Sequence, residues 1–214
     1  SAQDLVQETF FRVWTRAAQW DGRGPFKAWL YRIATNLALN HLRALRRTAV
    51  QAMRQLAGFN PRLVGSVLDG TAGPHTRIAL HLFAESSEAV VLFFREKGIP
   101  FSQEQRQIRW FNGEHRQVEL VITELDGHTI ESAVFEPVHL RQAPPSPIDG
   151  KPQRRAALAE VELILADQLA QAGGLVAAGQ PADHQHVAVL EQVAGVIHPG
   201  RQQVDHVRGE GAEL

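Results

Sequence analysis

Apolar side chains recur at helical spacing through the first 47 residues of the chain. They share one side of a first predicted helix at Val6, Phe10, Val13, Trp14 and Ala17. A glycine-rich turn from Asp21 to Gly24 interrupts the pattern, and Pro25 opens a second helix. The apolar stripe of that second helix consists of Phe26, Trp29, Leu30, Ile33, Ala34 and Leu37. The pattern therefore predicts a helical hairpin.

From Pro61 onward the pattern changes to strands and turns. Strands are predicted over residues 63–68, 78–83, 105–111, 117–125 and 129–135, and a helix capped by Ser86 or Ser87 lies between the second and third. Asn112-Gly113 and Asp126-Gly127 join the last three strands, and these dipeptides are preferred in tight hairpins. We therefore expect an antiparallel meander, followed by a proline-rich loop over 142–150 and a short helix over 155–166.

Three parts are expected along the chain. Residues 1–47 form a helical segment, residues 48–166 an α+β unit, and residues 167–214 a tail that is predicted to be disordered. The fold class is thus α+β, with an N-terminal helical hairpin followed by a small mixed α/β domain that contains the meander. The tail has no Phe, Tyr or Trp, which suits a linker or a GC-rich gene read in the wrong frame.

Composition narrows the class of protein. A hydrophobic content of 44% and a charged content of 21% are typical of globular proteins. The absence of cysteine excludes disulfides and thiolate metal sites. No apolar run is long enough for a membrane helix and the N-terminus is not that of a signal peptide, so a cytoplasmic location is predicted. The histidines match no metal-binding spacing, and we expect no metal and no cofactor.

Charge is unevenly distributed along the chain. Residues 1–47 contain eight Lys and Arg against three Asp and Glu, a local balance of +5, whereas the whole chain carries −1. Arginines among aromatic residues favour binding of single-stranded nucleic acid, by neutralising its backbone and stacking on its bases. The alternative is a helical hairpin whose aromatic residues are all core and whose arginines are a solvated face.

The runs DLVQETFFRVW and GPFKAWLYRIATNLALNHLR resemble the second conserved region of extracytoplasmic-function sigma factors of bacterial RNA polymerase. In that family the first helix docks on the polymerase, and the loop and second helix open the promoter. The resemblance implies core RNA polymerase and promoter DNA as partners, and it allows an anti-sigma protein as a further partner. The implied polymerase-facing residues are Asp4, Leu5, Gln7, Glu8 and Phe11. The implied DNA-facing residues are Arg23, Lys27, Arg32, Asn36 and Arg43.

Two departures from the family pattern stand out. The family usually has Asp at the position of Asn40. The family's first helix of this domain would precede Ser1, so we expect the chain to be a fragment.

A second, weaker resemblance concerns the middle of the chain. Gly65-Ser66, followed by a turn and a strand, resembles a divergent nucleotidyltransferase domain. That resemblance implies Gly65, Ser66 and Glu131 as nucleotide-binding positions. Arg77 and Ala79 stand where the family has its two magnesium carboxylates, so we expect no catalysis there. The plain alternative is that Gly65-Ser66 is only a tight turn.

These observations favour a promoter-recognition module that binds and does not catalyse. The alternative places the function in the nucleotidyltransferase-like domain, which would bind a nucleotide. A third interpretation is a hybrid reading frame with no selected function.

Overall fold

The computed structural model describes residues 7, 10–15, 20, 25–110, 113–146 and 150–178, with side chains as far as residue 170. Its contacts define two compact units, one containing Ser1–Leu37 and the other Ala38–Gln180. The predicted tail beyond residue 178 and the predicted turn at Asp21 to Gly24 lie outside the described residues.

Helix α2 (Phe26–Gln55) is a single helix of 30 residues. It starts where the sequence predicts, because the carbonyl of Pro25 accepts a hydrogen bond from the backbone N–H of Ala28 at 2.9 Å and Pro needs no N–H partner at a helix start. Residues 10–15 are also helical, and the Thr15 hydroxyl donates to the carbonyl of Phe11 at 3.0 Å.

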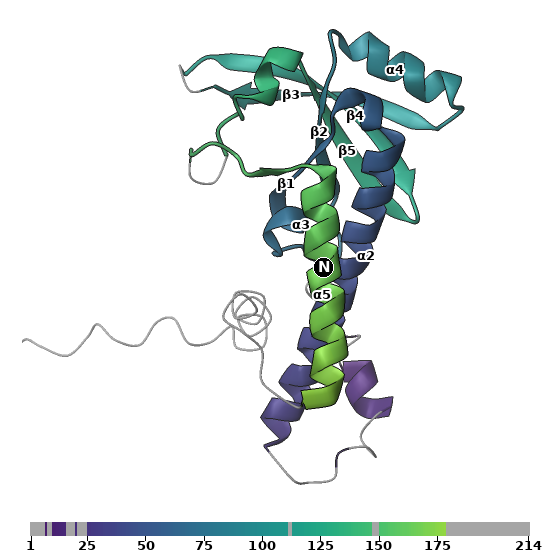
Figure 1. The fold of residues 1–214 in the computed structure, drawn as a ribbon, viewed down its shortest axis with the longest axis vertical. Helices are drawn as coiled ribbons and strands as arrows, with labels where there is room; N and C mark the ends of the chain where they lie inside the picture. The colour runs from purple at the N-terminus through teal and green to yellow at the C-terminus, as the bar shows by residue number, and fades with distance from the viewer. Residues whose placement is uncertain are drawn as a thin grey trace, which may run out of the picture. The chain divides into compact units, whose positions relative to one another are not determined.

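A six-stranded sheet organises the second unit (Figure 1). Its strands are β1 (Arg62–Val64), β2 (Ile78–Phe83), β3 (Phe101–Arg109), β4 (His115–Leu125), β5 (His128–Phe135) and β6 (Arg155–Ala156). Their spatial order is β3-β4-β5-β2-β1-β6, and only β2 and β5 pair in parallel. The predicted meander is confirmed by the antiparallel pairs β3–β4 and β4–β5. Asp126 and Gly127 both have positive φ, as a two-residue hairpin turn requires.

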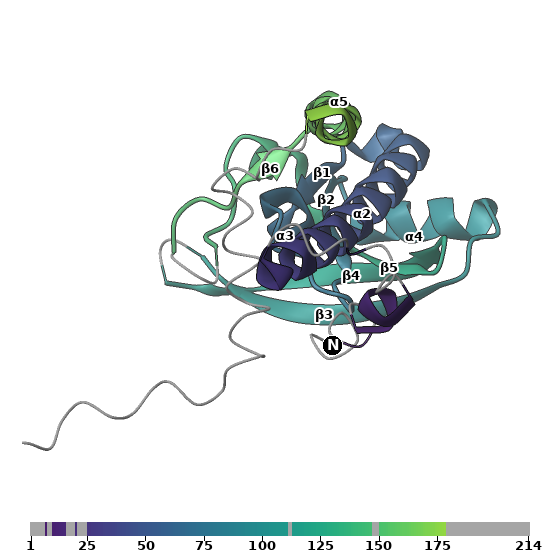
Figure 2. The same cartoon turned by 90° about the horizontal axis from the view of Figure 1, so that it is seen from below.

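Helices cover one face of this sheet, as Figure 2 shows for α2, α4 (Ser87–Glu96) and α5 (Leu158–Ala178). The core between helices and sheet includes Leu45, Met53, Leu80, Val90 and Val161, all fully buried. A second, smaller cluster lies on the other face and contains Phe83, Trp110, Val118, Leu120, Ala133 and Phe135. Two short 3-10 helices, η2 (Ala57–Phe59) and η3 (Pro137–Leu140), complete the unit together with α3 (Gly65–Asp69).

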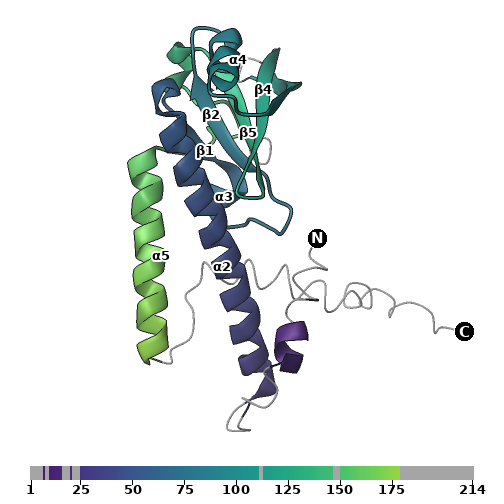
Figure 3. The ribbon, with the colours of Figure 1, turned by 90° about the vertical axis from the view of Figure 1, so that its right-hand side faces the viewer.

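Three predicted elements differ from those observed. The strand predicted over 105–111 is β3, which starts earlier, at Phe101, and ends at Arg109. The strand predicted over 63–68 ends at Val64, because Gly65 takes a φ of +70° and starts the short helix α3. The helix predicted over 155–166 starts later and runs further, from Leu158 to Ala178, since residues 155–156 pair with β1 as strand β6. Figure 3 shows α5 running beside the second-unit part of α2. Within the described ranges, no helix combines the length and the apolarity needed to cross a membrane.

Candidate functional site

Aromatic rings gather where α2 begins. The ring centroids of Trp20 and Phe26 lie 5.4 Å apart in an edge-on arrangement, and those of Phe26 and Trp29 lie 5.7 Å apart. Trp20 is 40% exposed and Phe26 is 46% exposed, while Trp29 is half-buried. The cluster therefore offers ring surface to solvent, which a core role for all of these aromatics would not leave.

The described part of the first helical segment exposes large apolar side chains. Phe10 is 60% exposed, Phe11 65% and Trp14 84%. Together with the exposed Gln7, these positions follow the 3.6-residue repeat and lie on one side of a helix. Gln7 and Phe11, two of the implied polymerase-facing residues, are thus accessible. Asp4, Leu5 and Glu8 lie outside the described residues.

The implied DNA-facing residues of α2 lie on more than one side of the helix. Arg32 and Asn36 are exposed and stand one turn apart. Lys27 precedes Arg32 by five residues, so it lies about 140° away around the helix, with its ammonium group 5.6 Å from the ring centroid of Tyr31. Arg23 lies outside the described residues.

Arg43 is more enclosed than its neighbours on the polar side. Its Nη1 donates a hydrogen bond to Oδ1 of Asn40 at 2.8 Å, and its Nε is buried without a partner among the described residues. Burial lowers the pKa of Arg43, and the charge of Arg47 lowers it further. The guanidinium remains charged at neutral pH, because arginine does not deprotonate in proteins.

Arg46 does not belong to the solvent-facing basic set. It is only 5% exposed, and it donates from Nε to the carbonyl of Val67 at 3.0 Å and from Nη2 to the carbonyl of Leu68 at 2.9 Å. These bonds attach α2 to the end of α3. The sequence holds a signal for this, since Arg46 lies four residues after Leu42 and so belongs to the buried side of α2.

The implied nucleotide-binding positions are brought to one region of the sheet. Gly65 and Ser66 start α3 directly after β1, and β1 pairs with β2. On β2, Ala79 stands beside Glu131 of β5 in the parallel register. The pairing of β2 with β5 therefore brings Ala79 and Glu131 next to each other.

The carboxylate of Glu131 forms ion pairs with two arginines. Arg106 binds it with two hydrogen bonds, Nη1 to Oε1 at 2.6 Å and Nη2 to Oε2 at 2.8 Å, and Arg77 approaches Oε2 at 3.4 Å. Sequence reasoning missed Arg106, because a polar strand residue carries no motif. In the described part of the chain no three His, Asp or Glu side chains gather as a metal site would need.

A histidine is buried on the same face of the sheet. His81 is 5% exposed, and its Nδ1 accepts a hydrogen bond from Nε of Arg155 at 3.1 Å. Arg155 also donates to the carbonyl of His139 at 2.7 Å and stacks over Phe83. Burial lowers the pKa of His81 to about 3, and the charge of Arg155 contributes. His81 is therefore neutral at physiological pH, which suits an acceptor and not a cationic binding group.

Comparison with known proteins identifies relatives for part of the chain. The family model of sigma-70 region 2 matches residues 1–48. The chain is 46% identical over 106 residues to the ECF RNA polymerase sigma factor SigE of Mycolicibacterium smegmatis, covering 48% of this chain and 41% of that protein. It is 46% identical over 46 residues to SigG of Mycobacterium tuberculosis, covering 22% of this chain and 12% of that protein. It is 43% identical over 42 residues to SigW of Bacillus subtilis, covering 20% and 22%.

These matches reach only part of each protein, since the chain spans between 12% and 41% of the length of these three relatives. No solved structure matches the chain significantly. The family model covers the segment that holds the aromatic cluster and the exposed Arg32. Residues 1–48 therefore resemble region 2 of the ECF sigma factors of RNA polymerase.

Proposed function

We propose that residues 1–48 bind core RNA polymerase and promoter DNA in the manner of a sigma factor, so that the chain acts in transcription initiation by binding. The observation that carries this proposal is the match of residues 1–48 to sigma-70 region 2. A sigma-like role agrees with the local charge of +5 over residues 1–47, which favours contact with a polyanion.

Polymerase contact is assigned to the first helical segment. Phe11 and Gln7 are exposed there beside Phe10 and Trp14. Large apolar side chains exposed together on one side of a helix favour a protein partner over solvent. Asp4, Leu5 and Glu8 join this surface by the resemblance alone.

DNA contact is assigned to the start of α2 and its polar side. Arg32 and Asn36 supply a guanidinium and an amide for phosphates and base edges. Trp20 and Phe26 supply exposed rings on which a separated base can stack. Arg43, with Lys27 and Arg23, completes the set by the resemblance.

The test is binding of the full chain to a fluorescent single-stranded oligonucleotide over a range of salt concentrations. Arg32→Ala should weaken binding and reduce the slope of log K against log salt by about 0.7, the value for one lost phosphate contact on a single strand. Arg95→Ala removes another exposed arginine, from α4, and should change neither quantity. Equal affinity and slope for the parent and Arg32→Ala would refute the DNA assignment.

A nucleotide-binding role of the middle domain is the second candidate, with Gly65, Ser66 and Glu131 as its residues. The observation in its favour is the register that sets Ala79 beside Glu131. Against magnesium chemistry stands the pairing of Glu131 with Arg77 and Arg106. Calorimetric titration with ATP, with and without magnesium, tests it. Binding that Ser66→Ala abolishes would support this candidate, and no heat of binding would remove it.

A further inference from the structure

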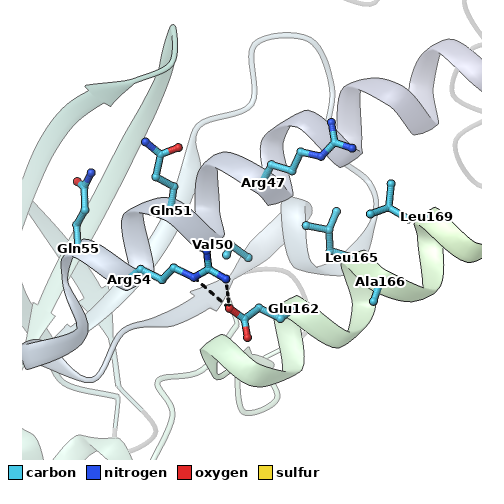
Figure 4. A pocket seen from close by; sticks show the side chains of 9 residues that line it. All are labelled: Arg47, Val50, Gln51, Arg54, Gln55, Glu162, Leu165, Ala166 and Leu169. Carbon is cyan, nitrogen blue, oxygen red and sulfur yellow. Dashed lines mark hydrogen bonds and ion pairs between the residues drawn. The ribbon is translucent and has the colours of Figure 1, made fainter.

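Helices α2 and α5 enclose a groove in the second unit (Figure 4). It has a volume of ≈ 640 Å³, and its lining includes Arg47 and Arg54 of α2 and Glu162, Leu165, Ala166 and Leu169 of α5. The α5 side is mainly apolar, whereas the α2 side carries two arginines. The two helices run in opposite directions along it, because Arg54 meets Glu162 at one end and Arg47 accompanies Leu169 at the other.

The side of α5 next to this groove is apolar and exposed. Ala159, Leu163, Ala166 and Ala170 recur at helical spacing and all face solvent, and Leu163 is 63% exposed. Leu169, 44% exposed, joins them at the groove. Small residues beside a leucine allow a second helix to approach closely along this stripe, and burying it would remove apolar surface from water.

Acidic side chains lie on one edge of this apolar stripe, and basic side chains lie on the opposite edge, at the groove. Glu160 and Asp167 are exposed and stand seven residues apart, so they lie on one side of α5, beyond the stripe and away from the groove. Glu160 has Nη2 of Arg154 of its own chain at 3.8 Å. Arg47 is exposed on the groove side and makes no ion pair within the described part of the chain. Arg54 is already held by Glu162, at 2.7 Å. One acidic edge and one basic edge therefore flank the same apolar surface.

We propose that this surface pairs with the same surface of a second copy of the chain, so that the two α5 helices lie side by side and parallel. A two-fold axis along the helices turns the acidic edge of the second copy toward α2 of the first. Because α2 and α5 are antiparallel, Asp167 of the second copy then lies at the level of Arg47, and Glu160 at the level of Arg54. The result is a four-helix arrangement with an apolar centre and opposite charges at its rim. This inference concerns the second unit and does not depend on the sigma-like role.

The test is the molar mass of the full chain in solution, measured by light scattering after size exclusion over a range of concentrations. The parent should be a dimer. Leu163→Glu places a charge in the stripe without touching the buried core and should give a monomer. Leu92→Glu, at a leucine that is 55% exposed on α4, is the matched control and should remain a dimer. A monomeric parent, or a dimer that Leu163→Glu leaves intact, would overturn the proposal.

A charge exchange tests the arrangement of the two helices. Arg47→Asp and Asp167→Arg should each weaken the dimer at least about threefold, because like charges then face each other. The double variant should recover the affinity of the parent, most clearly at low salt. If the double variant is as weak as the sum of the single changes predicts, the parallel pairing is wrong.

Discussion

Arg46 and Arg47 are neighbours in sequence with opposite surroundings. The guanidinium of Arg46 is buried and donates two hydrogen bonds to the carbonyls at the end of α3, while Arg47 faces solvent. A count of charges along the sequence treats the two arginines alike. They differ because Arg46 lies on the buried side of α2 and Arg47 does not. A basic run in a helix is therefore a mixture of structural and accessible charges until the core side of that helix is identified.

Replacing Arg46 by Ala should destabilise the second unit. Two carbonyls lose a charged donor in a buried position, so we expect a loss of about 2–4 kcal/mol in the free energy of unfolding. Urea denaturation followed by circular dichroism measures this. Arg95→Ala, at an exposed position of α4, is the control and should change stability by less than about 0.5 kcal/mol. Equal effects of the two substitutions would contradict the anchoring role of Arg46.

His81 should make folding stability depend on pH. Its pKa falls from 6.5 to about 3 in the folded state. The unfolded chain therefore binds a proton between these values that the folded chain does not, and stability rises with pH across that window. The contribution of His81 to the free energy of unfolding is fully present above pH 6.5. It decreases as the pH falls toward 3, with a slope of up to about 1.4 kcal/mol per pH unit.

His81→Asn isolates this contribution, because an amide oxygen can accept the bond from Arg155 without titrating. Its unfolding free energy, measured in denaturant at pH 7 and pH 5, should change less with pH than that of the parent. His115→Asn, at an exposed position of β4, should retain the dependence of the parent. A variant His81→Asn with the full dependence would assign the effect to other groups.

At the scale of elements, the alternation of the strands and the turn dipeptides made the meander predictable. Asp126-Gly127 and the apolar positions Val118, Leu120 and Ile130 are local signals that the structure confirms. The short strand β6 could not be predicted, because its two residues become a strand only through pairing with β1. The end of β1 was missed for a similar reason, since Gly65 marks a change of direction that its neighbours Leu63 and Val67 do not reveal.

The candidate site was predictable to a different degree in each unit. The hairpin pattern and the family resemblance identified residues 4–47, and the family model, which matches residues 1–48, confirms that resemblance. The roles assigned to single residues there stay predictions. In the middle domain, the sequence identified Arg77, Ala79 and Glu131 as related positions, but Arg106 reaches Glu131 from β3, a contact that no local pattern encodes.

Glu131 of β5 forms ion pairs with Arg77, which directly precedes β2, and with Arg106 of β3. Glu131→Gln keeps the shape of the side chain and removes its charge. Both arginines are about half exposed, so solvent screens the pairs, and we expect a loss of only about 1–2 kcal/mol in thermal or urea unfolding. Glu124→Gln, at an exposed position of β4, should be neutral. No difference between the two variants would mean that the pairs contribute nothing to stability.

At the scale of the whole molecule, the two units carry different proposals. The first contains Phe11 and Arg32 of the sigma-like segment, whose Arg43 lies in the second unit. The second unit also contains the sheet, the Glu131 pairs and the α2–α5 groove. The tests are independent because they change different residues. Leu163→Glu should abolish self-association and leave the DNA affinity of each single chain unchanged, although a dimer with two DNA-binding surfaces can bind a long strand more tightly than one copy does.

The central claim is that the first helical segment binds the transcription machinery, and retention of the full chain on immobilised bacterial core RNA polymerase tests it most directly. We predict that the parent is retained, that Phe11→Asp is lost because a charge enters the exposed apolar side, and that Leu92→Asp on α4 is retained like the parent. Failure of the parent to bind, or equal retention of Phe11→Asp and the parent, would contradict the account.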